Sequence, residues 1–161
     1  MKTELKRPEI DPAGMRFAII VSRWNNGYTS RLEAGAREAL AGADVSTFVV
    51  PGAFELPVAA KTAAETGKFD AVVALGVVIR GDTPHFDYVA GQAASGLMRA
   101  SLDTGVPVMF GVITADTHEQ ADVRCGERED NKGYEAALSA AEMVAAMHEI
   151  KGKRRAVPNV D

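Results

Sequence analysis

A polar turn between a long apolar run and a helix carries the residues with the clearest capacity for chemistry. The run covers residues 71–79, is rich in valine, and suits a strand that is covered on both faces in a parallel sheet. Gly81 and Asp82 end it. Thr83 can cap the next helix and Pro84 fits its first position, so the free amides of that helix face the end of the strand. A phosphate is the natural ligand of such a turn.

His85 follows this turn and is predicted at about the second position of the helix. The positive end of the helix dipole favours the neutral imidazole there, whereas a bound phosphate favours the charged form. The side chain can then exchange protons near neutral pH as a general acid or base. The alternative is an ordinary helix start, with His85 packed or solvated.

A second pair of residues also suits an anion. Arg124 is predicted to close one helix and Lys132 to open the next. The arginine offers a planar fork and the lysine a point charge, so both can converge on one phosphate. The alternative for Arg124 is a charged cap on its own helix, and for Lys132 a solvated surface position.

Two further candidates follow the first two predicted strands. Trp24, the only tryptophan, lies on a loop where its flat ring can stack on a heterocycle. Glu55, in the turn after residues 50–52, can accept hydrogen bonds from a ligand, or it can serve only as a favourable charge at a helix N-terminus. Ligands of parallel sheets bind at the carboxyl ends of the strands. We therefore expect these residues to lie at one edge of a sheet.

The pattern that must position these residues alternates between strand and helix. Strands are predicted over residues 16–22, 45–50, 71–79 and 106–114, and helices over residues 30–40, 54–66, 84–103, 118–124 and 132–149. This alternation requires right-handed crossovers and a parallel sheet with helices on both faces. The sequence predicts an α/β fold, a flavodoxin-like three-layer sandwich with a four-stranded parallel sheet. Residues 1–15 are expected to form an N-terminal arm, 16–150 one domain and 151–161 a disordered basic tail.

Composition excludes several classes of protein. The 161 residues are 47% hydrophobic and carry a net charge of −4. Residues 151–161 contain four basic residues and one acidic residue, so the remaining 14 basic and 21 acidic residues give residues 1–150 a net charge of −7. A domain with this negative charge is not expected to bind nucleic acid. No apolar segment approaches the roughly 20 residues that span a bilayer, and no signal peptide is visible, so we expect no membrane partner and a cytoplasmic protein. The single cysteine, Cys125, excludes internal disulfides and is expected to be a packing group.

Several motifs together resemble the lumazine synthase family. They are residues 17–25 (FAIIVSRWN), 50–57 (VPGAFELP), 76–89 (GVVIRGDTPHFDYV), 105–114 (GVPVMFGVIT) and 131–133 (NKG). They occur in the family's order and nearly its spacing, and the resemblance covers about residues 16–148. A co-linear set of motifs is far more specific than a lone glycine motif.

The resemblance implies the penultimate step of riboflavin synthesis. In that step 5-amino-6-(D-ribitylamino)uracil condenses with 3,4-dihydroxy-2-butanone 4-phosphate to 6,7-dimethyl-8-ribityllumazine, with release of phosphate and water. It implies no cofactor and no metal. It also implies a homo-oligomer, either a free pentamer or a shell of twelve pentamers, and admits riboflavin synthase as a partner.

The resemblance also assigns roles to individual residues. His85 matches the family's proton donor, and Trp24 takes the ring-stacking position usually held by phenylalanine. The pyrimidine and ribityl site would comprise Trp24, Asn25, Ala53, Phe54, Glu55, Val77, Val78, Ile79 and, from the neighbouring subunit, Phe110. The phosphate site would comprise Gly81, Asp82, Thr83, Arg124 and Lys132.

Some segments depart from the family pattern. The link at residues 41–44 is short, residues 128–130 replace a more basic loop, and Cys125 stands where alanine is common. None of these changes removes a reacting group. The compact loop 124–132 resembles that of shell-forming members, whereas Pro8 and Pro12 would disturb an N-terminal strand that joins a neighbour's sheet.

Two other functions share part of this pattern. A flavodoxin-like flavin or nucleotide binder would carry a glycine-rich phosphate loop after the first strand, and residues 23–27 (RWNNG) form no such loop. A carrier or shell protein without catalysis would keep the subunit interfaces and lose His85, Arg124 or Glu55. All three residues are present.

Overall fold

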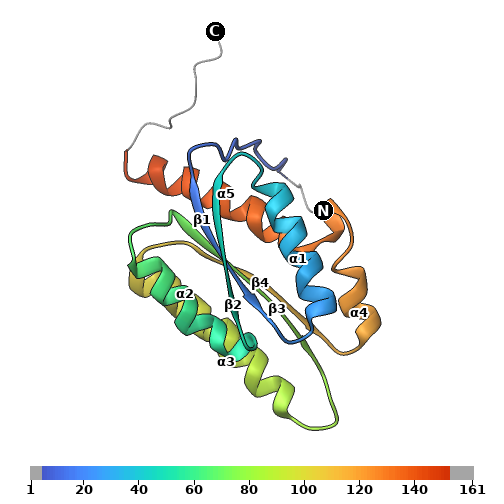
Figure 1. Cartoon of the computed structure of the whole chain (residues 1–161). Helices are drawn as coiled ribbons and strands as arrows, with labels where there is room; N and C mark the ends of the chain where they lie inside the picture. The colour runs from blue at the N-terminus through green and yellow to red at the C-terminus, as the bar shows by residue number, and fades with distance from the viewer. Residues whose placement is uncertain (1–4, 153–161) are drawn as a thin grey trace.

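Four parallel strands separate two layers of helices in a computed structural model of the chain, which describes residues 5–152 (Figure 1). In chain order the elements are β1 (Arg16–Ser22), α1 (Asn26–Ala39), β2 (Asp44–Val50), η1 (Ala53–Glu55), α2 (Leu56–Glu65), β3 (Ala71–Ile79), α3 (His85–Thr104), β4 (Val108–Ala115), α4 (His118–Val123), η2 (Arg128–Asp130) and α5 (Lys132–Ile150). The segments η1 and η2 are short 3-10 helices. The predicted α/β fold with flavodoxin-like layers is confirmed.

The strand order β2-β1-β3-β4 puts the two most buried strands at the centre of the sheet. β1 pairs in parallel with both β2 and β3, and β3 pairs in parallel with β4. The chain therefore winds outward in one direction from β1 to β2 and in the other from β3 to β4. The reversal between β1 and β3 is a topological switch point, where such sheets open a crevice at the carboxyl edge.

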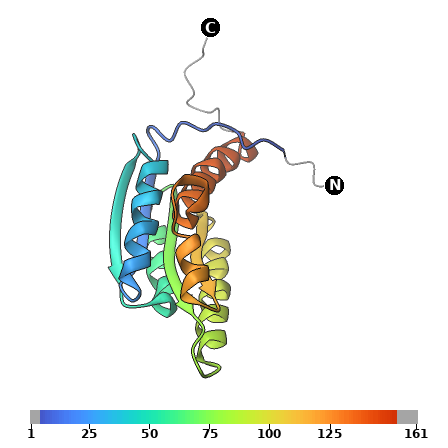
Figure 2. The same ribbon diagram turned by 90° about the vertical axis from the view of Figure 1, so that its right-hand side faces the viewer.

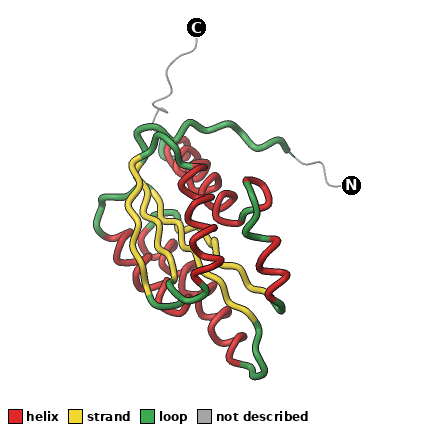
Figure 3. Tube along the Cα trace, turned by 45° about the vertical axis from the view of Figure 1, so that its right-hand side comes forward, coloured by secondary structure: helices red, strands yellow, loops and turns green. Residues whose placement is uncertain are grey.

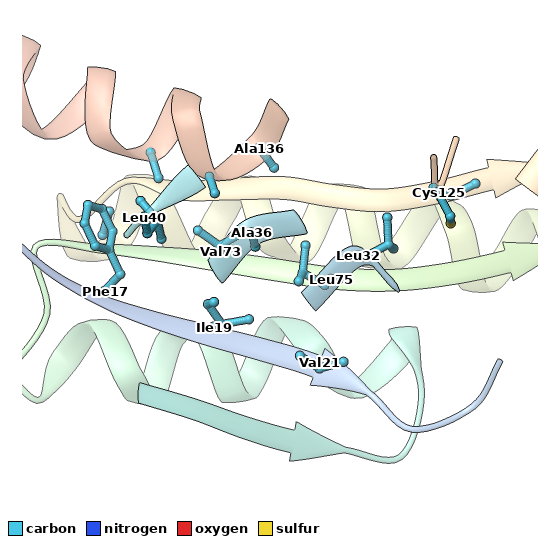
Figure 4. Packing of buried hydrophobic residues seen from close by; sticks show 14 of the residues in the cluster. Phe17, Ile19, Val21, Leu32, Ala36, Leu40, Val73, Leu75, Cys125 and Ala136 are labelled. Atoms are coloured by element: carbon cyan, nitrogen blue, oxygen red, sulfur yellow. The ribbon is translucent and has the colours of Figure 1, made fainter. Parts of the chain in front are cut away.

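Successive residues of β1 pack on opposite faces of the sheet. Phe17, Ile19 and Val21 belong to the core beneath α1 and α5, which Figure 4 shows. Ala18 and Ile20 belong to the core beneath α2 and α3. Because both faces are covered, the central strands β1 and β3 are almost wholly apolar, as the sequence indicated, whereas the edge strand β2 carries polar residues and stays partly exposed. Figure 3 shows the strands between the two helical layers.

α1 and α5 approach so closely that their contact requires glycine. A β-carbon on Gly133 would lie 2.1 Å from the carbonyl oxygen of Leu32, and one on Gly35 would lie 2.5 Å from Oδ1 of Asn131. Asn131 is buried, and its Nδ2 donates to the Arg31 carbonyl at 3.0 Å. The first and last long helices thus form one packed unit.

Two predicted helix boundaries were wrong. α1 begins at Asn26 rather than near residue 30, because Asn25 adopts the left-handed conformation with φ 61° and starts the helix directly after β1. The apolar spacing begins only at Leu32, so it did not reveal the first turn. The helix predicted over residues 54–66 is divided into η1 and α2, with Pro57 in the first turn of α2.

The N-terminal arm lies over the chain's own last helix (Figure 2). Nη1 of Arg7 lies 3.2 Å from the Ser139 hydroxyl and 3.3 Å from a carboxylate oxygen of Glu142. Residues 5–12 form no strand, in keeping with the prolines in this segment. Only residues 151–152 of the basic tail are described, so its predicted disorder lies outside the described residues. No helix within residues 5–152 is long and apolar enough to cross a membrane.

Candidate functional site

The carboxyl ends of the strands bring together most of the residues that the sequence singled out. The loops after β1 and β2 are joined by two backbone hydrogen bonds, from Arg23 N to Val50 O at 2.8 Å and from Trp24 N to Pro51 O at 3.0 Å. The turn after β3, which forms the lower tip of the molecule in Figure 2, continues from the same edge. The loops after β1 and β2 are therefore held together at this edge.

Trp24 rests on Gly52 and is otherwise open to solvent. A β-carbon on Gly52 would lie 2.4 Å from Cε3 of the indole, so the ring contacts the backbone there. The residue is nevertheless 60% exposed. A large apolar ring supported on one side and uncovered elsewhere is available for stacking on a planar ligand.

Glu55 closes the turn on which Trp24 rests. Its Oε2 accepts a hydrogen bond from the backbone amide of Gly52 at 3.0 Å, which completes a capping box at the start of η1. This is the helix-terminal role that the sequence left open as the alternative for Glu55. The carboxylate thereby holds Gly52 under the indole.

Asn25 ties the loop after β1 to β3. Its side-chain Nδ2 donates to the carbonyl oxygen of Val77 at 2.9 Å, across the switch point. The left-handed backbone of Asn25 turns the chain at this position. The strained conformation and the hydrogen bond together fix where Trp24, the preceding residue, can lie.

The predicted apolar lining is divided between buried and exposed positions. Ala53 and Val77 are buried, Val78 and Ile79 are half-buried, and Phe54 is exposed. Phe110 lies in the middle of β4, opposite Ala74, and is 46% exposed. It is thus the one predicted pyrimidine-site residue that the chain does not bring to its own carboxyl edge.

The turn after β3 differs from the prediction by one position. Pro84 rather than Thr83 is the N-cap of α3, and His85 is its first residue. The Thr83 hydroxyl lies 3.4 Å from the amide nitrogen of His85, so it contacts the chain two residues on instead of capping the helix. Pro84 has a helical φ of −66° but a ψ of 0°, which lies outside the helix, so the cap is one residue later than predicted. Residues 81–85 are all exposed.

Arg124 and Lys132 are neighbours through their backbones. The amide of Lys132 donates to the Arg124 carbonyl at 2.9 Å, next to an antiparallel bridge between Cys125 and Asn131. Their side chains rest on their own helices, with Arg124 Nη1 2.8 Å from the Gln120 carbonyl and Lys132 Nζ 2.9 Å from a Glu135 carboxylate oxygen. The structure thus shows the helix-cap alternative for Arg124, and both cations stay exposed.

Cys125 is a packing residue, as predicted. It is buried in the core beneath α1 and α5, and this burial raises the pKa of its thiol. No group of three or more His, Cys, Asp or Glu side chains that could hold a metal ion occurs within residues 5–152.

Arg80 was not among the predicted site residues. Its Nε lies 2.8 Å from Oδ1 of Asp116, its Nη1 lies 3.3 Å from Oδ1 of Asp87, and its Cζ lies 4.4 Å from the ring centroid of Phe86. The hydrogen bond to Asp116 is the main cause that raises the pKa of Arg80. The only signal in the sequence was a lone cation directly after a buried strand and close to several aspartates.

Comparison with known proteins identifies a family over most of the chain. Residues 14–148 match the family model described as 6,7-dimethyl-8-ribityllumazine synthase. The chain is also 51% identical over 142 residues to the 6,7-dimethyl-8-ribityllumazine synthase of Syntrophus aciditrophicus (strain SB). That alignment covers 85% of this chain and 92% of the relative. The similarity spans every strand and the whole carboxyl edge.

Proposed function

Because the chain belongs to the 6,7-dimethyl-8-ribityllumazine synthase family and acts in riboflavin biosynthesis, we propose that its active site is the carboxyl edge around Trp24, His85 and Arg124. The enzyme condenses 5-amino-6-(D-ribitylamino)uracil with 3,4-dihydroxy-2-butanone 4-phosphate and releases phosphate and water. The observation that carries the site assignment is the exposed indole held on Gly52 at the switch point of the sheet. One edge then offers a stacking surface beside a polar turn.

The pyrimidine would stack on Trp24. Asn25 fixes the loop through its hydrogen bond to β3. The half-buried residues Val78 and Ile79 at the end of β3, together with Ala53 and Phe54, would contact the pyrimidine. Glu55 accepts one hydrogen bond through Oε2 and can accept others from the ribityl hydroxyls or the ring, because a carboxylate has about four acceptor positions.

The phosphate of the second substrate would bind at residues 81–83 and Arg124. The exposed amides of this turn suit a dianion, and the Arg124 guanidinium can exchange its helix carbonyl for the stronger charged partner. Lys132 lies beside Arg124 through the backbone bond and adds a second positive charge. Asp82 lies in the same turn, and its negative charge disfavours a bound phosphate.

His85 would move the protons of the condensation. The 5-amino group attacks the ketone, the carbinolamine loses water to give an imine, and the phosphate leaves with the electron pair of its C–O bond. Protonation of the departing hydroxyl and removal of a carbon-bound proton both need a general acid or base, and an imidazole can serve as either. Much of the rate would come from holding an amine and a reactive ketone in contact.

Exposed apolar residues support a homo-oligomer, which we propose to be a pentamer. An apolar groove of about 320 Å³ lies between β2 and α2, away from the carboxyl edge. Large apolar side chains are also exposed on several elements, namely Phe48, Val49, Val58, Tyr88, Met98, Leu102 and Phe110. An exposed apolar groove with further apolar side chains uncovered on the same chain marks a candidate protein interface. Phe110 of one subunit would complete the pyrimidine site of its neighbour. We extend the proposal to a shell of twelve pentamers, to riboflavin synthase as a partner and to a cytoplasmic location.

A direct assay tests the activity. Purified protein incubated with both substrates should develop the absorbance of the lumazine chromophore and release phosphate at a proportional rate. A flavin or nucleotide carrier, or a shell protein without catalysis, would bind a ribityl-pyrimidine analogue and produce no chromophore above the uncatalysed reaction.

Replacing Trp24 by alanine should weaken binding of a ribityl-pyrimidine analogue by about 1–3 kcal/mol, the range for a base stacked on an aromatic side chain. In the unmodified chain the analogue should quench the fluorescence of this single tryptophan. Trp24→Phe is the matched control, because it keeps an aromatic face and should retain most of the affinity. Absence of quenching at saturating analogue would exclude stacking on Trp24.

Replacing Arg124 by lysine should raise the KM for the butanone phosphate about 10-fold and leave the KM for the pyrimidine almost unchanged. The ammonium keeps the charge but loses the planar fork that fits two phosphate oxygens. Inorganic phosphate should compete with the butanone phosphate only. Steady-state kinetics with each substrate varied separately measures both effects, and equal changes in the two KM values would assign Arg124 to the subunit interface instead.

A further inference from the structure

Arg80 connects the two halves of the proposed phosphate site. It directly follows β3, and its backbone amide donates to the Ala115 carbonyl at 2.8 Å, which continues the pairing of β3 with β4. Its guanidinium reaches Asp116 at the end of β4 and Asp87 in the first turn of α3. It also lies over the ring of Phe86. The Arg80 side chain therefore connects the start of α3 to the end of β4, which lie about 30 residues apart in the sequence.

On one side, these contacts lead to the other phosphate-site cation. The backbone amide of Asp116 donates to Oε1 of Gln120 at 2.8 Å, and the Gln120 carbonyl accepts from Nη1 of Arg124 at 2.8 Å. A continuous chain of polar contacts thus runs from Arg80 through Asp116 and Gln120 to Arg124. A shift of Asp116 would move the first turn of α4 and, with it, the carbonyl on which Arg124 rests.

On the other side, the contacts lead to the turn and the proton donor. Phe86 and Asp87 directly follow His85 in the first turn of α3. The cation–π contact with Phe86 and the ion pair with Asp87 fix that turn relative to the end of β4. Arg80 is therefore connected both to the turn that carries His85 and the amides of residues 81–83, and to Arg124.

Charge gives Arg80 a second role. The Asp87 and Asp116 side chains are 61% and 63% exposed, and with Asp82 they put three carboxylates in the segments directly after β3 and β4, where a phosphate dianion is proposed to bind. Like charges at this range disfavour the anion, although salt screens them. The guanidinium pairs with two of the three carboxylates and offsets their charge.

We propose that Arg80 is a positioning residue for the phosphate-bearing substrate, which it favours by joining the two halves of the site and by offsetting part of the negative charge of Asp87 and Asp116. This inference rests on the proposed phosphate position at residues 81–83 and Arg124. It adds a residue that does not itself touch the reacting atoms.

Steady-state kinetics of Arg80→Gln tests the proposal. At low salt the KM for the butanone phosphate and the inhibition constant of inorganic phosphate should each rise about 3-fold to 10-fold, whereas the KM for the pyrimidine should change less than 2-fold. Both increases should shrink near 0.5 M salt, because the Debye length there falls to roughly 4 Å. A merely structural defect would not depend on salt in this way.

Removal of the carboxylates supplies the decisive comparison. In the Arg80→Gln chain, adding Asp87→Asn and Asp116→Asn should restore the affinity for the phosphate substrate, because the two carboxylates that Arg80 pairs with no longer carry charge. Asp116→Asn alone brings the group of Arg80 and its two partners from one net negative charge to neutrality and should lower the inhibition constant of inorganic phosphate. If the triple variant binds the phosphate substrate as weakly as Arg80→Gln does, Arg80 does not act by offsetting the charge of Asp87 and Asp116.

Arg16→Gln is the matched control. Arg16 pairs with Asp70 at 3.3 Å at the opposite end of β1, so its loss also leaves an aspartate unpaired but far from the site. Neither KM should change. If Arg80→Gln leaves the butanone phosphate KM unchanged while Arg124→Lys raises it, the inference on Arg80 is wrong and the phosphate site stands. If neither variant alters that KM, the proposed phosphate site is itself wrong.

Discussion

Replacing His85 by alanine is expected to lower kcat by about 10-fold to 1,000-fold without loss of the folded structure. His85 is exposed at the first position of α3, so the truncation leaves no cavity in the core. The variant loses the group that transfers protons during imine formation and phosphate departure. It should retain the part of the rate that comes from holding the two substrates in contact.

Rapid mixing with both substrates, followed by lumazine absorbance, measures the effect. His148→Ala is the matched control, because His148 lies in the last turn of α5, at the other end of that helix from Lys132. Its kcat should equal that of the unmodified chain. A His85→Ala variant with unchanged kcat would remove His85 from the mechanism.

Replacing Gly133 by alanine is expected to lower the free energy of unfolding by about 3 kcal/mol or more. The added β-carbon would lie 2.1 Å from the Leu32 carbonyl oxygen, and a backbone atom cannot move aside as a flexible side-chain tip can. α5 would have to separate from α1, which would expose part of the core beneath both helices.

Urea unfolding followed by circular dichroism measures this change. Gly91→Ala is the matched control, because Gly91 lies within α3 and a β-carbon there would meet no atom within 4 Å. That variant should be neutral or gain about 0.5–1 kcal/mol from the better helix propensity of alanine. Equal unfolding midpoints for Gly133→Ala and the unmodified chain would contradict the close approach of α1 and α5.

Features set by local pattern could be predicted from the sequence. The valine-rich run of β3 could be assigned to a buried parallel strand because such strands need apolar residues on both faces. The exposure of Trp24 followed from its position on a loop, and the burial of Cys125 from the usual behaviour of lone cysteines. The family followed from ordered motifs, which no local pattern alone would have shown.

Features that depend on distant contacts could not be predicted. The start of α1 depends on the left-handed backbone of Asn25, whose side chain bonds to Val77 in another strand. The side chain of Arg80 meets a carboxylate 36 residues away, which no spacing rule relates to it. The roles of Arg124 and Lys132 as phosphate ligands stay predictions, because their side chains rest on their own helices in the protein alone.

The packing of α1 on α5 also bears on how the chain folds as it is synthesised. The hydrogen bond from Asn131 to Arg31 joins residues 100 positions apart, and Arg7 meets Ser139 across 132 positions. At roughly 5–20 residues per second, a ribosome needs about 5–20 s to make the 100 residues between the first helix and its partner. During that interval the apolar face of α1 has no final partner. The nascent protein can complete the core beneath α1 and α5 only when α5 leaves the ribosome, so the apolar face of α1 rests on transient contacts until then.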